Sequence, residues 1–220
     1  PTMPKVVSVA SVAEVVHVSS DEDDDVVPLG PMWGPEVCAG APPLRFRGYQ
    51  RGRELGSGAS GRVFLCSRQG AAGDFAVKTV DLRRMALQAG SGKERTKLSR
   101  EVEILKLLPP HRAIVSMLDA FEDGKWFFMI LEFVEGGDLF GALTSRRPSR
   151  FLEGEAAHVL RRVSEGLGFL HEHGVIHRDV KLENVLIASA QRSQDNILYE
   201  VKLTDFGLSK VVGTGLSGPH

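Results

Sequence analysis

Three glycines at the spacing G-x-G-x-x-G are the first residues in this chain that could do chemistry. Gly56, Gly58 and Gly61 are followed, two residues on, by Val63. Because glycine has no side chain, the backbone of such a loop can approach a polyphosphate and direct its N–H groups at the oxygens. The same spacing marks dinucleotide-binding folds and also occurs in ordinary glycine-rich hairpins. Strand-like residues on both sides of these glycines favour a loop that covers ATP.

A lysine at the end of an apolar strand is the second candidate. Lys78 closes the segment Phe75–Lys78, 17 residues after Gly61. A lysine in a buried strand needs a counter-charge, which a phosphate or a carboxylate supplies. Glu101 on the following predicted helix could provide it, and Glu103 is the competing choice. The alternative interpretation is a strand-end lysine whose ammonium reaches solvent.

Two further polar motifs lie later in the chain. The octet His177–Asn184 reads H-R-D-V-K-L-E-N and follows a predicted amphipathic helix. Asp205-Phe206-Gly207 follows the short predicted strand 201–203. A carboxylate at a strand end, followed by glycine, is a natural metal-binding turn. Taken singly, the D-F-G triplet arises often by chance, so its meaning depends on the motifs that precede it.

The elements that must position these motifs fall into two parts. Hydrophobic spacing of three and four predicts helices over 92–108 and 153–171. Alternating apolar residues predict strands around Leu55 and at 63–66, 75–80, 114–121, 126–133, 185–187 and 201–203. We expect the insert Ser189–Tyr199 to be a surface loop. Five strands and a helix therefore precede a mainly helical part, an order that predicts an α+β fold with two dissimilar lobes.

In this order, the four motifs resemble those of the eukaryotic protein kinase family. The resemblance covers about Tyr49–Lys210. It implies a two-lobed α+β fold, with a five-stranded antiparallel sheet and a helix over about 49–134 and an incomplete helical lobe over about 135–220. It also implies ATP and Mg²⁺ bound between the lobes, a protein substrate, and phosphorylation of serine or threonine.

Roles in phosphate binding carry over by position. The resemblance implies that Gly56, Gly58 and Gly61 cover the phosphates, and that Lys78 holds the α- and β-phosphates. It favours Glu101 as the partner of Lys78, because a family glutamate is followed, three and four residues on, by a pair like Ile104-Leu105.

The same resemblance assigns the transfer machinery. Asp179 would accept or orient the proton of the substrate hydroxyl, and Lys181 would neutralise the γ-phosphate. Asn184 and Asp205 would bind Mg²⁺. Phosphoryl transfer stabilises charge on oxygen, so cations and aimed N–H groups are what it requires.

An adenine pocket is also implied by the resemblance. Aliphatic residues would form its roof and floor, the segment 132–134 would be the hinge that binds adenine through its backbone, and an acid would meet the ribose. These residues are Leu55, Val63 and Ala76 for the roof, Leu186 for the floor, Leu131 at the gatekeeper position, Glu132, Phe133 and Val134 in the hinge, and Asp138 at the ribose. Plain core packing is the alternative interpretation of the aliphatic set.

Within the family, Lys181 resembles the serine/threonine branch, because it lies two residues after Asp179. Leu182 departs from the usual proline. The segments Tyr49–Leu55, Arg100–Leu105 and Asp205–Lys210 look most like calmodulin-dependent or calcium-dependent kinases.

Charge and composition limit the partners. Lys and Arg number 27 and Asp and Glu 28, a net charge of −1, which removes the simplest argument for a nucleic-acid partner. No run of 18 apolar residues occurs, so we expect no membrane segment. Two cysteines, Cys38 and Cys66, cannot form a disulfide framework and favour a reducing compartment. We expect a cytoplasmic location, with the nucleus as the alternative.

The charge is unevenly distributed. Residues 1–44 hold one base and seven acids, a net of −6, whereas the remainder carries a net of +5. The run Ser19–Asp25 repels itself, and the prolines that follow break regular elements. We interpret 1–44 as an acidic, proline-containing disordered tail that precedes a partial kinase domain at 45–220. An acidic docking or phosphorylation segment is the sharper alternative.

Two other interpretations compete with an active kinase. The sequence stops 13 residues beyond Gly207, so the resemblance implies a C-terminally truncated domain whose helix 153–171 exposes an apolar stripe. Such a chain could be a catalytically weak or dead fragment that binds nucleotide, a partner kinase or a regulator. An unrelated nucleotide-binding module is the third interpretation. His171, His173 and His177 could also suggest a zinc site, but the resemblance assigns His177 to the catalytic loop.

Overall fold

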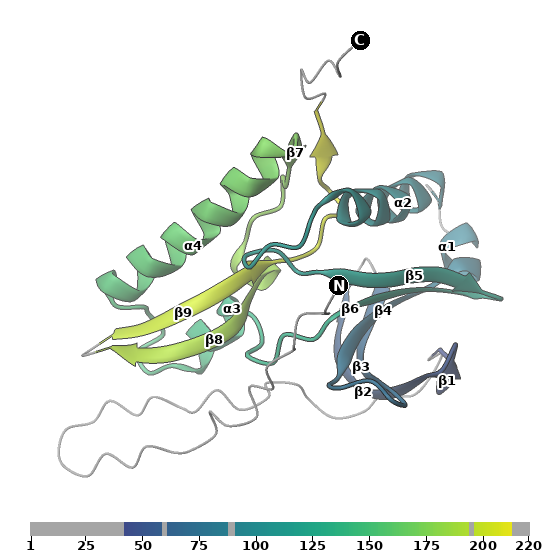
Figure 1. Cartoon of the computed structure of the whole chain (residues 1–220), viewed down its shortest axis with the longest axis horizontal. Coiled ribbons are helices and arrows are strands. Elements are labelled where there is room, and N and C mark those ends of the chain that lie inside the picture. Colours follow the sequence, from purple (N-terminus) through teal and green to yellow (C-terminus); the bar gives the residue numbers. More distant parts are fainter. Residues whose placement is uncertain (1–41, 59–60, 88–90, 194–195, 213–220) are drawn as a thin grey trace.

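The computed structural model describes residues 42–58, 61–87, 91–193 and 196–212, and it consists of two parts (Figure 1). The predicted tail 1–44 lies, apart from its last three residues, outside the described residues. The first part is a curled antiparallel sheet with two helices, and the second holds two helices and a long hairpin. This is the α+β arrangement that the sequence predicts.

A six-stranded sheet forms the first part, with strand order β1-β2-β3-β4-β6-β5. The five predicted strands are present, and a two-residue strand is added at one edge. The strands are β1 (Arg45–Phe46), β2 (Tyr49–Gly58), β3 (Gly61–Arg68), β4 (Phe75–Asp81), β5 (Met117–Asp123) and β6 (Trp126–Glu132). Every pair in this sheet is antiparallel.

The strand predicted at 114–121 begins only at Met117. Residues before it pair elsewhere: Ile114 forms a parallel bridge with Leu203, and the Val115 N–H donates to the Leu203 carbonyl at 3.0 Å. The chain therefore leaves the second part before it enters the sheet. Hydrophobic alternation cannot show whether these residues pair with Leu203 or with a strand of the sheet, because either pairing buries the same side chains.

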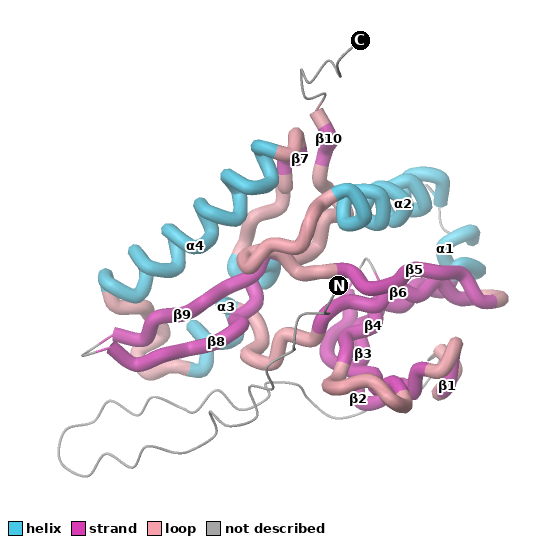
Figure 2. The backbone as a smooth tube through the Cα atoms, in the orientation of Figure 1, coloured by secondary structure: helices cyan, strands magenta, loops and turns pink. Residues whose placement is uncertain are grey.

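Two helices accompany the sheet, and α2 lies beside the β5 edge (Figure 2). Helix α1 (Leu82–Leu87) was not predicted, and the Asp81 carboxylate accepts hydrogen bonds from two N–H groups in its first turn. Helix α2 (Ser91–Leu107) follows the predicted range, with Leu98, Ile104 and Leu105 buried. Pro109 and Pro110 follow the end of this helix and cannot continue it.

The second part is less helical than predicted. Its helices are α3 (Leu139–Ser145), α4 (Glu153–Glu172) and the single 3₁₀ turn η1 (Leu182–Asn184), and its strands are β7 (Val175–Ile176), β8 (Val185–Ser193), β9 (Asn196–Leu203) and β10 (Lys210–Val211). Strands β8 and β9 pair as an antiparallel hairpin, and β7 pairs with β10.

The surface loop expected at Ser189–Tyr199 was wrong, because the described part of this segment extends the β8–β9 hairpin. Tyr199 is buried and meets the ring of Phe151 edge-on at 5.8 Å between ring centroids. The extension forms because β9 packs along α4, which buries the side chains on one face of the strand.

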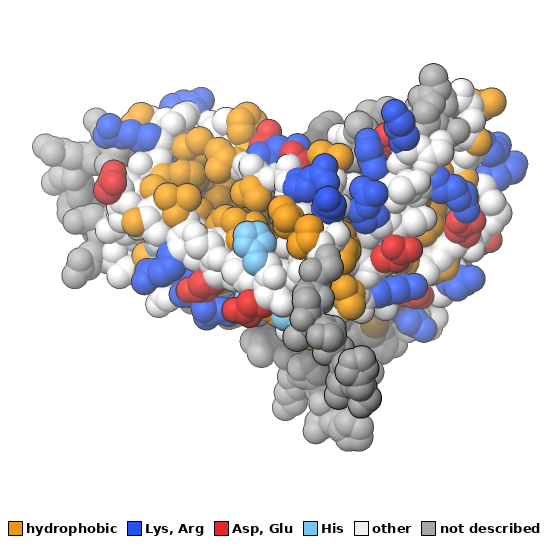
Figure 3. All heavy atoms as spheres, turned by 90° about the horizontal axis from the view of Figure 1, so that it is seen from above, with side chains coloured by type: hydrophobic (Ala, Val, Ile, Leu, Met, Phe, Trp, Pro, Cys, Tyr) orange, Lys and Arg blue, Asp and Glu red, His pale blue; other side chains and the backbone are white. Residues whose placement is uncertain are grey.

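The same packing corrects the expected apolar stripe on α4. Val163 and Leu170 are buried, and a Cβ at Gly166 would come within 3.1 Å of the Leu203 side chain, so the helix approaches β9 closely. Of the three leucines on this stripe, Leu160, Leu167 and Leu170, Leu160 is the strongly exposed one, at 65%. Figure 3 shows hydrophobic side chains gathered on the face of the molecule where α4 lies. No helix in the described ranges is long and apolar enough to cross a membrane.

Two hydrophobic clusters stabilise the fold. The larger one joins both parts and includes Ile104, Met129, Leu170 and Phe206. The smaller one lies within the sheet of the first part and is rich in aromatic residues: Phe46, Tyr49, Phe64, Phe121 and Phe128. The larger cluster is the one that positions the candidate site, because it carries side chains from α2, β6, α4 and the segment after β9.

Candidate active site

Lys78 lies at the centre of the candidate site. It belongs to β4, between Val63 on β3 and Met129 on β6. Its ammonium donates to both carboxylate oxygens of Glu101 on α2, at 2.8 and 2.7 Å. Asp205 lies 3.6 Å from the same ammonium. Lys78 is thus held by carboxylates from two elements far apart in sequence.

Burial and the neighbouring charges have opposite effects on the pKa of Lys78. Lys78 is 7% exposed and Glu101 4%. Burial lowers the pKa of Lys78, but the carboxylates of Glu101 and Asp205 outweigh it and raise the pKa above its ordinary value. Lys78 is therefore a fixed cation. Glu103, the competing choice, is exposed on the same helix.

The octet His177–Asn184 forms a loop around the carboxylate of Asp179. Lys181 donates to Asp179 Oδ2 at 3.0 Å. The Asn184 side-chain amide donates to the backbone carbonyl of Asp179 at 2.8 Å and to its Oδ2 at 2.9 Å. The hydrogen bond from Lys181, assisted by that from Asn184, lowers the pKa of Asp179 despite partial burial. Asp179 is accordingly an ionised acceptor at neutral pH.

His177 stabilises this loop through hydrogen bonds of its ring. Its Nδ1 accepts from the Asp179 N–H at 3.3 Å, so its Nε2 carries the proton and donates to the Thr204 carbonyl at 3.0 Å. Burial lowers the pKa of His177, which keeps the ring neutral. The ring also lies 5.1 Å from that of Phe206, between centroids. His177 therefore connects the catalytic-loop motif to the D-F-G motif.

The backbone is strained at two positions of the site. Arg178 has φ of 68° and Asp205 has φ of 62°, and both are non-glycine residues in the left-handed region. Such conformations cost free energy and persist where the surrounding contacts fix them. Here the Gly207 N–H donates to Asp205 Oδ1 at 3.4 Å, and Ser209 Oγ donates to the His177 carbonyl at 3.0 Å. The first contact involves the Asp205 carboxylate that also lies 3.6 Å from Lys78, and the second joins the segment after Asp205 to the loop around Asp179.

The glycine-rich segment is the turn of the β2–β3 hairpin. Gly56 pairs with Val63, and Gly58 pairs with Gly61. Gly61 has φ of 126°, and a Cβ there would lie 2.5 Å from the Thr79 carbonyl oxygen. A side chain at Gly61 would therefore clash with β4. Residues 59 and 60 lie outside the described residues.

The aliphatic residues expected around adenine belong to one cluster. Leu55, Ala76, Leu131 and Val134 are buried there, and Val63 and Leu186 pack against them as partly buried residues. They come from β2, β3, β4, β6, the segment after β6, and β8. The structure therefore brings together the side chains that the sequence predicts as roof and floor.

A family comparison agrees with this geometry. The model of the protein kinase domain matches residues 49–217. The chain belongs to the protein kinase family.

Relatives of this kinase chain indicate its branch. It is 34% identical over 163 residues to a calcium/calmodulin-dependent protein kinase type 1 of Caenorhabditis elegans. The aligned region covers 74% of this chain and 43% of that relative. It is 36% identical over 161 residues to calcium-dependent protein kinase 8 of Arabidopsis thaliana, covering 73% and 28%. The predicted likeness to this serine/threonine group is confirmed. The chain spans less than half the length of either relative.

Two predicted nucleotide-binding residues of this kinase chain carry structural contacts as well. Asp138 caps α3, and its Oδ1 accepts from the Gly141 N–H at 2.8 Å. Glu132 accepts from the Ser116 N–H at 2.7 Å and from Lys202 on β9. The side chain of Glu132 thus joins the two lobes. The hinge role that the resemblance implies for residues 132–134 concerns their backbone and stays a prediction.

The predicted magnesium ligands supply oxygen donors of a suitable kind. The side-chain nitrogen of Asn184 donates to Asp179, so the side-chain oxygen of Asn184 is the atom that would face a metal ion. Asp205 contributes a partly exposed carboxylate. Mg²⁺ is commonly bound by one or two carboxylates together with substrate phosphates. Accordingly, a kinase needs no cluster of three acidic or histidine ligands, and none occurs among the described residues.

Sequence reasoning missed contacts that support the kinase site. Glu54 on β2 pairs with Arg62 on β3 beside the glycine-rich turn. Glu155, near the start of α4, binds Arg146 and two backbone N–H groups. A glutamate at the third helical position is a known helix-start signal and could have indicated Glu155. Two of the histidines weighed as zinc ligands have other partners: His173 contacts the Phe169 carbonyl at 2.8 Å, and His177 contacts the Thr204 carbonyl.

Proposed function

We propose that this chain transfers the γ-phosphoryl group of ATP to serine or threonine hydroxyls of a protein substrate. The observation that carries the proposal is the convergence of Lys78, Glu101 and Asp205 at one point of the site. A buried cation held by carboxylates on two different elements is preorganised to receive phosphate oxygens. Membership of the protein kinase family supports the use of ATP.

The phosphates of ATP would lie between Lys78 and the β2–β3 turn. Backbone N–H groups of this turn would face the phosphate oxygens, because glycines leave the backbone uncovered. Lys78 would neutralise charge on the α- and β-phosphates. Electrostatic stabilisation of this kind requires that the cation is fixed before the reaction, and its contacts with Glu101 fix it.

Asp179 would accept or orient the proton of the attacking hydroxyl. Its lowered pKa keeps the carboxylate ionised, and the contacts of Asn184 hold it in position. Lys181 is exposed enough to leave Asp179 and contact the γ-phosphate when ATP is present. Asn184 and Asp205 would hold Mg²⁺, which, when bound, neutralises phosphate charge.

Paired substitutions in one loop test this function. We expect Asp179→Asn to lower phosphotransfer to a serine-containing protein by about 10²-fold or more, with nucleotide binding retained. Glu183→Gln is the matched control, because Glu183 is an exposed acid of the same loop. It should retain activity. Nucleotide binding without phosphotransfer in the unsubstituted chain would contradict the proposal.

A function without phosphotransfer is favoured by one observation. Leu160 on α4 is strongly exposed, and Figure 3 shows hydrophobic side chains gathered on the face of the molecule where α4 lies. Exposed hydrophobic side chains of this kind are typical of a face that meets a partner. The second candidate is therefore a nucleotide-binding domain that binds a partner kinase or a regulator. It predicts that Leu160→Glu abolishes partner binding and leaves nucleotide affinity unchanged.

We also propose a cytoplasmic or nuclear location. Burial, with a contribution from the Asp74 charge, raises the pKa of the Cys66 thiol to about 12. A buried protonated thiol neither needs nor forms a disulfide, which suits a reducing compartment. Imaging of the tagged full chain in cells would test this assignment.

A further inference from the structure

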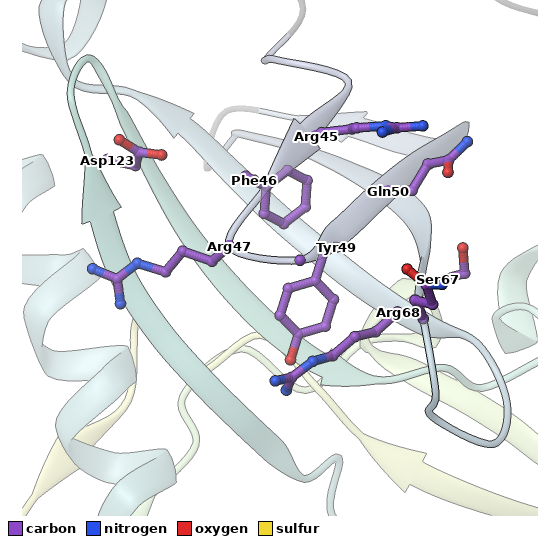
Figure 4. Close-up of a pocket in the computed structure, with 10 residues that line it drawn as sticks. Arg45, Phe46, Arg47, Tyr49, Gln50, Ser67, Arg68 and Asp123 are labelled. Carbon is purple, nitrogen blue, oxygen red and sulfur yellow. The ribbon is translucent and has the colours of Figure 1, made fainter.

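A cavity lined by arginines lies at the β1 end of the sheet (Figure 4). Its volume is about 590 Å³, and β1, β2 and β3 provide most of its lining. Arg45, Arg47 and Arg68 line it together with Phe46 and Tyr49. None of the candidate active-site residues contributes to this cavity, so the kinase reaction does not account for it.

Aromatic rings fix two of these arginines and leave their hydrogen-bond donors available. The Arg47 guanidinium lies 4.3 Å from the centroid of the Phe121 ring, and that of Arg68 lies 5.3 Å from the centroid of Tyr49. Stacking of this kind orients a guanidinium while its N–H groups remain free for an anion. All three arginines are exposed, and none of them forms an ion pair with an acid in the described ranges.

The charge of the cavity is positive. Asp123 is the one acid that lines it, against three arginines, which gives a formal charge of +2. Cysteine and histidine are absent from its lining, so the cavity offers no metal-binding set. Its chemistry is suited to carboxylates or phosphates.

The arrangement of the arginines indicates the shape of the ligand. Figure 4 shows Arg45 extending on the side of Gln50, Arg47 extending toward the Asp123 side, and Arg68 lying beside Tyr49. The three guanidinium groups lie apart from one another and do not converge on one point, and that of Arg68 stays against the Tyr49 ring. A single phosphate would need converging donors, whereas an extended segment with several carboxylates can meet diverging ones.

We propose that the acidic run Asp21–Asp25 of this same chain docks on the arginine cavity. Five consecutive acids form this run, and residues 1–44 carry a net charge of −6 against +5 for the remainder. A linker of about 20 residues joins Asp25 to Arg45 and spans up to about 60 Å when extended, so reach does not limit docking. Covalent connection also raises the effective concentration of the run at the cavity.

Docking of this run is independent of phosphotransfer, so a distance measurement tests it. A nitroxide label on Ser19→Cys, in a Cys38→Ser background of the full chain, would broaden nearby amide NMR signals. Cys66 is buried and does not take the label. We expect selective broadening at Gly48, Gln50 and Gln69, which line the cavity.

Two sets of substitutions make the measurement specific. We expect Arg45→Gln, Arg47→Gln and Arg68→Gln together to reduce the broadening at least ~5-fold, because they remove the positive charge. Neutralising residues 21–25 as amides should have the same effect without touching the folded part. Matched controls are Arg84→Gln, Arg150→Gln and Arg192→Gln, three exposed arginines that do not line the cavity, which should change nothing.

Salt and concentration complete the test. Raising salt from about 0.1 M to about 1 M shortens the Debye length from about 10 to about 3 Å, so the broadening should decrease. Broadening that survives the cavity substitutions, that spreads evenly over the surface, or that is absent altogether would overturn the proposal. Broadening that grows with protein concentration would mean docking between two copies and would equally overturn it.

Discussion

The ammonium of Lys202 lies 2.7 and 2.9 Å from the two carboxylate oxygens of Glu132. Lys202 belongs to β9 in the second lobe, and Glu132 ends β6 in the first. Glu132 also accepts from the Ser116 N–H, so this carboxylate is shared between the lobes. Glu132 is the first residue of the segment 132–134 that is predicted to meet adenine, so this contact attaches that segment to the second lobe.

This interlobe pair predicts a stability loss in Lys202→Met. The Lys202 and Glu132 side chains are only 17% and 30% exposed. Removing the lysine leaves a partly buried carboxylate without a counter-charge, which costs about 1–2 kcal/mol. Urea denaturation measures the change in the free energy of unfolding.

The control for this prediction is the exposed pair of Arg95 and Glu122, whose side chains are 57% and 50% exposed. Arg95→Met should cost less than about 0.5 kcal/mol, because water screens surface pairs. Equal losses in the two variants would contradict a special role for the interlobe contact.

Two glutamates on α2 provide a second prediction. Glu101→Gln leaves the buried Lys78 without its bidentate partner, so we expect a stability loss of about 3 kcal/mol. The pKa of Lys78 should decrease, since burial then outweighs the remaining carboxylate, and phosphotransfer should fall at least ~10-fold with it.

Glu103→Gln, two residues on, changes an exposed acid of the same helix and should leave both properties unchanged. Thermal denaturation and a phosphotransfer assay, carried out on both variants, check the prediction. Similar effects of the two substitutions would show that the carboxylate of Glu101 has no particular importance.

The site motifs could be read from the sequence because each one combines residue type with fixed local spacing. Gly61 illustrates this, since its φ of 126° and its close approach to Thr79 permit no other residue. The loop 177–184 could be recognised in the same way, because Lys181 and Asn184 both contact Asp179 within a stretch of six residues. Such short-range contacts leave a signature in the sequence.

Long-range contacts were harder to predict. Hydrophobic alternation indicated short strands at 185–187 and 201–203, but the hairpin continues to Ser193 and Asn196 because α4 packs along β9. The early part of the predicted strand 114–121 pairs with Leu203 for a similar reason. Which surface a segment meets depends on tertiary packing, and periodicity contains no information about the partner.

The third prediction concerns Glu155, which contacts the β8–β9 hairpin. It is 1% exposed, and its carboxylate contacts the Arg146 guanidinium at 2.6 and 3.1 Å. It also accepts from the Leu152 and Ile197 N–H groups, both at 2.9 Å, and Ile197 belongs to β9. We expect Glu155→Gln to cost about 2–3 kcal/mol, because the substitution removes a buried carboxylate charge that contacts Arg146 and two backbone N–H groups.

The contribution of Glu155 to the stability of the fold should depend on pH. Burial raises the pKa of Glu155, but Arg146 and the backbone donors outweigh burial and lower it below the ordinary value of 4.5. Its stabilising contribution is therefore present above pH 4.5 and lost as the pH falls through the lowered pKa. Glu153→Gln, at an exposed neighbouring position, should change neither the stability nor its acid dependence.

His177 gives a prediction in a separate pH range. Burial lowers its pKa below the ordinary value of 6.5, so the unfolded chain binds a proton more readily than the folded one. The free energy of unfolding should therefore decrease as the pH falls below 6.5, and it should stop decreasing once the folded-state pKa is passed. One such group contributes at most about 1.4 kcal/mol per pH unit.

His177→Gln should flatten this dependence between pH 6.5 and the onset of carboxylate protonation, although the variant is less stable throughout. His111 also has a pKa lowered mainly by partial burial, so His111→Asn is the matched control, and it should remove a smaller part of the slope. Chemical denaturation at several pH values measures both. An unchanged slope in His177→Gln would mean that this ring accepts a proton without disturbing its bonds to Thr204 and Asp179, contrary to the geometry of the site.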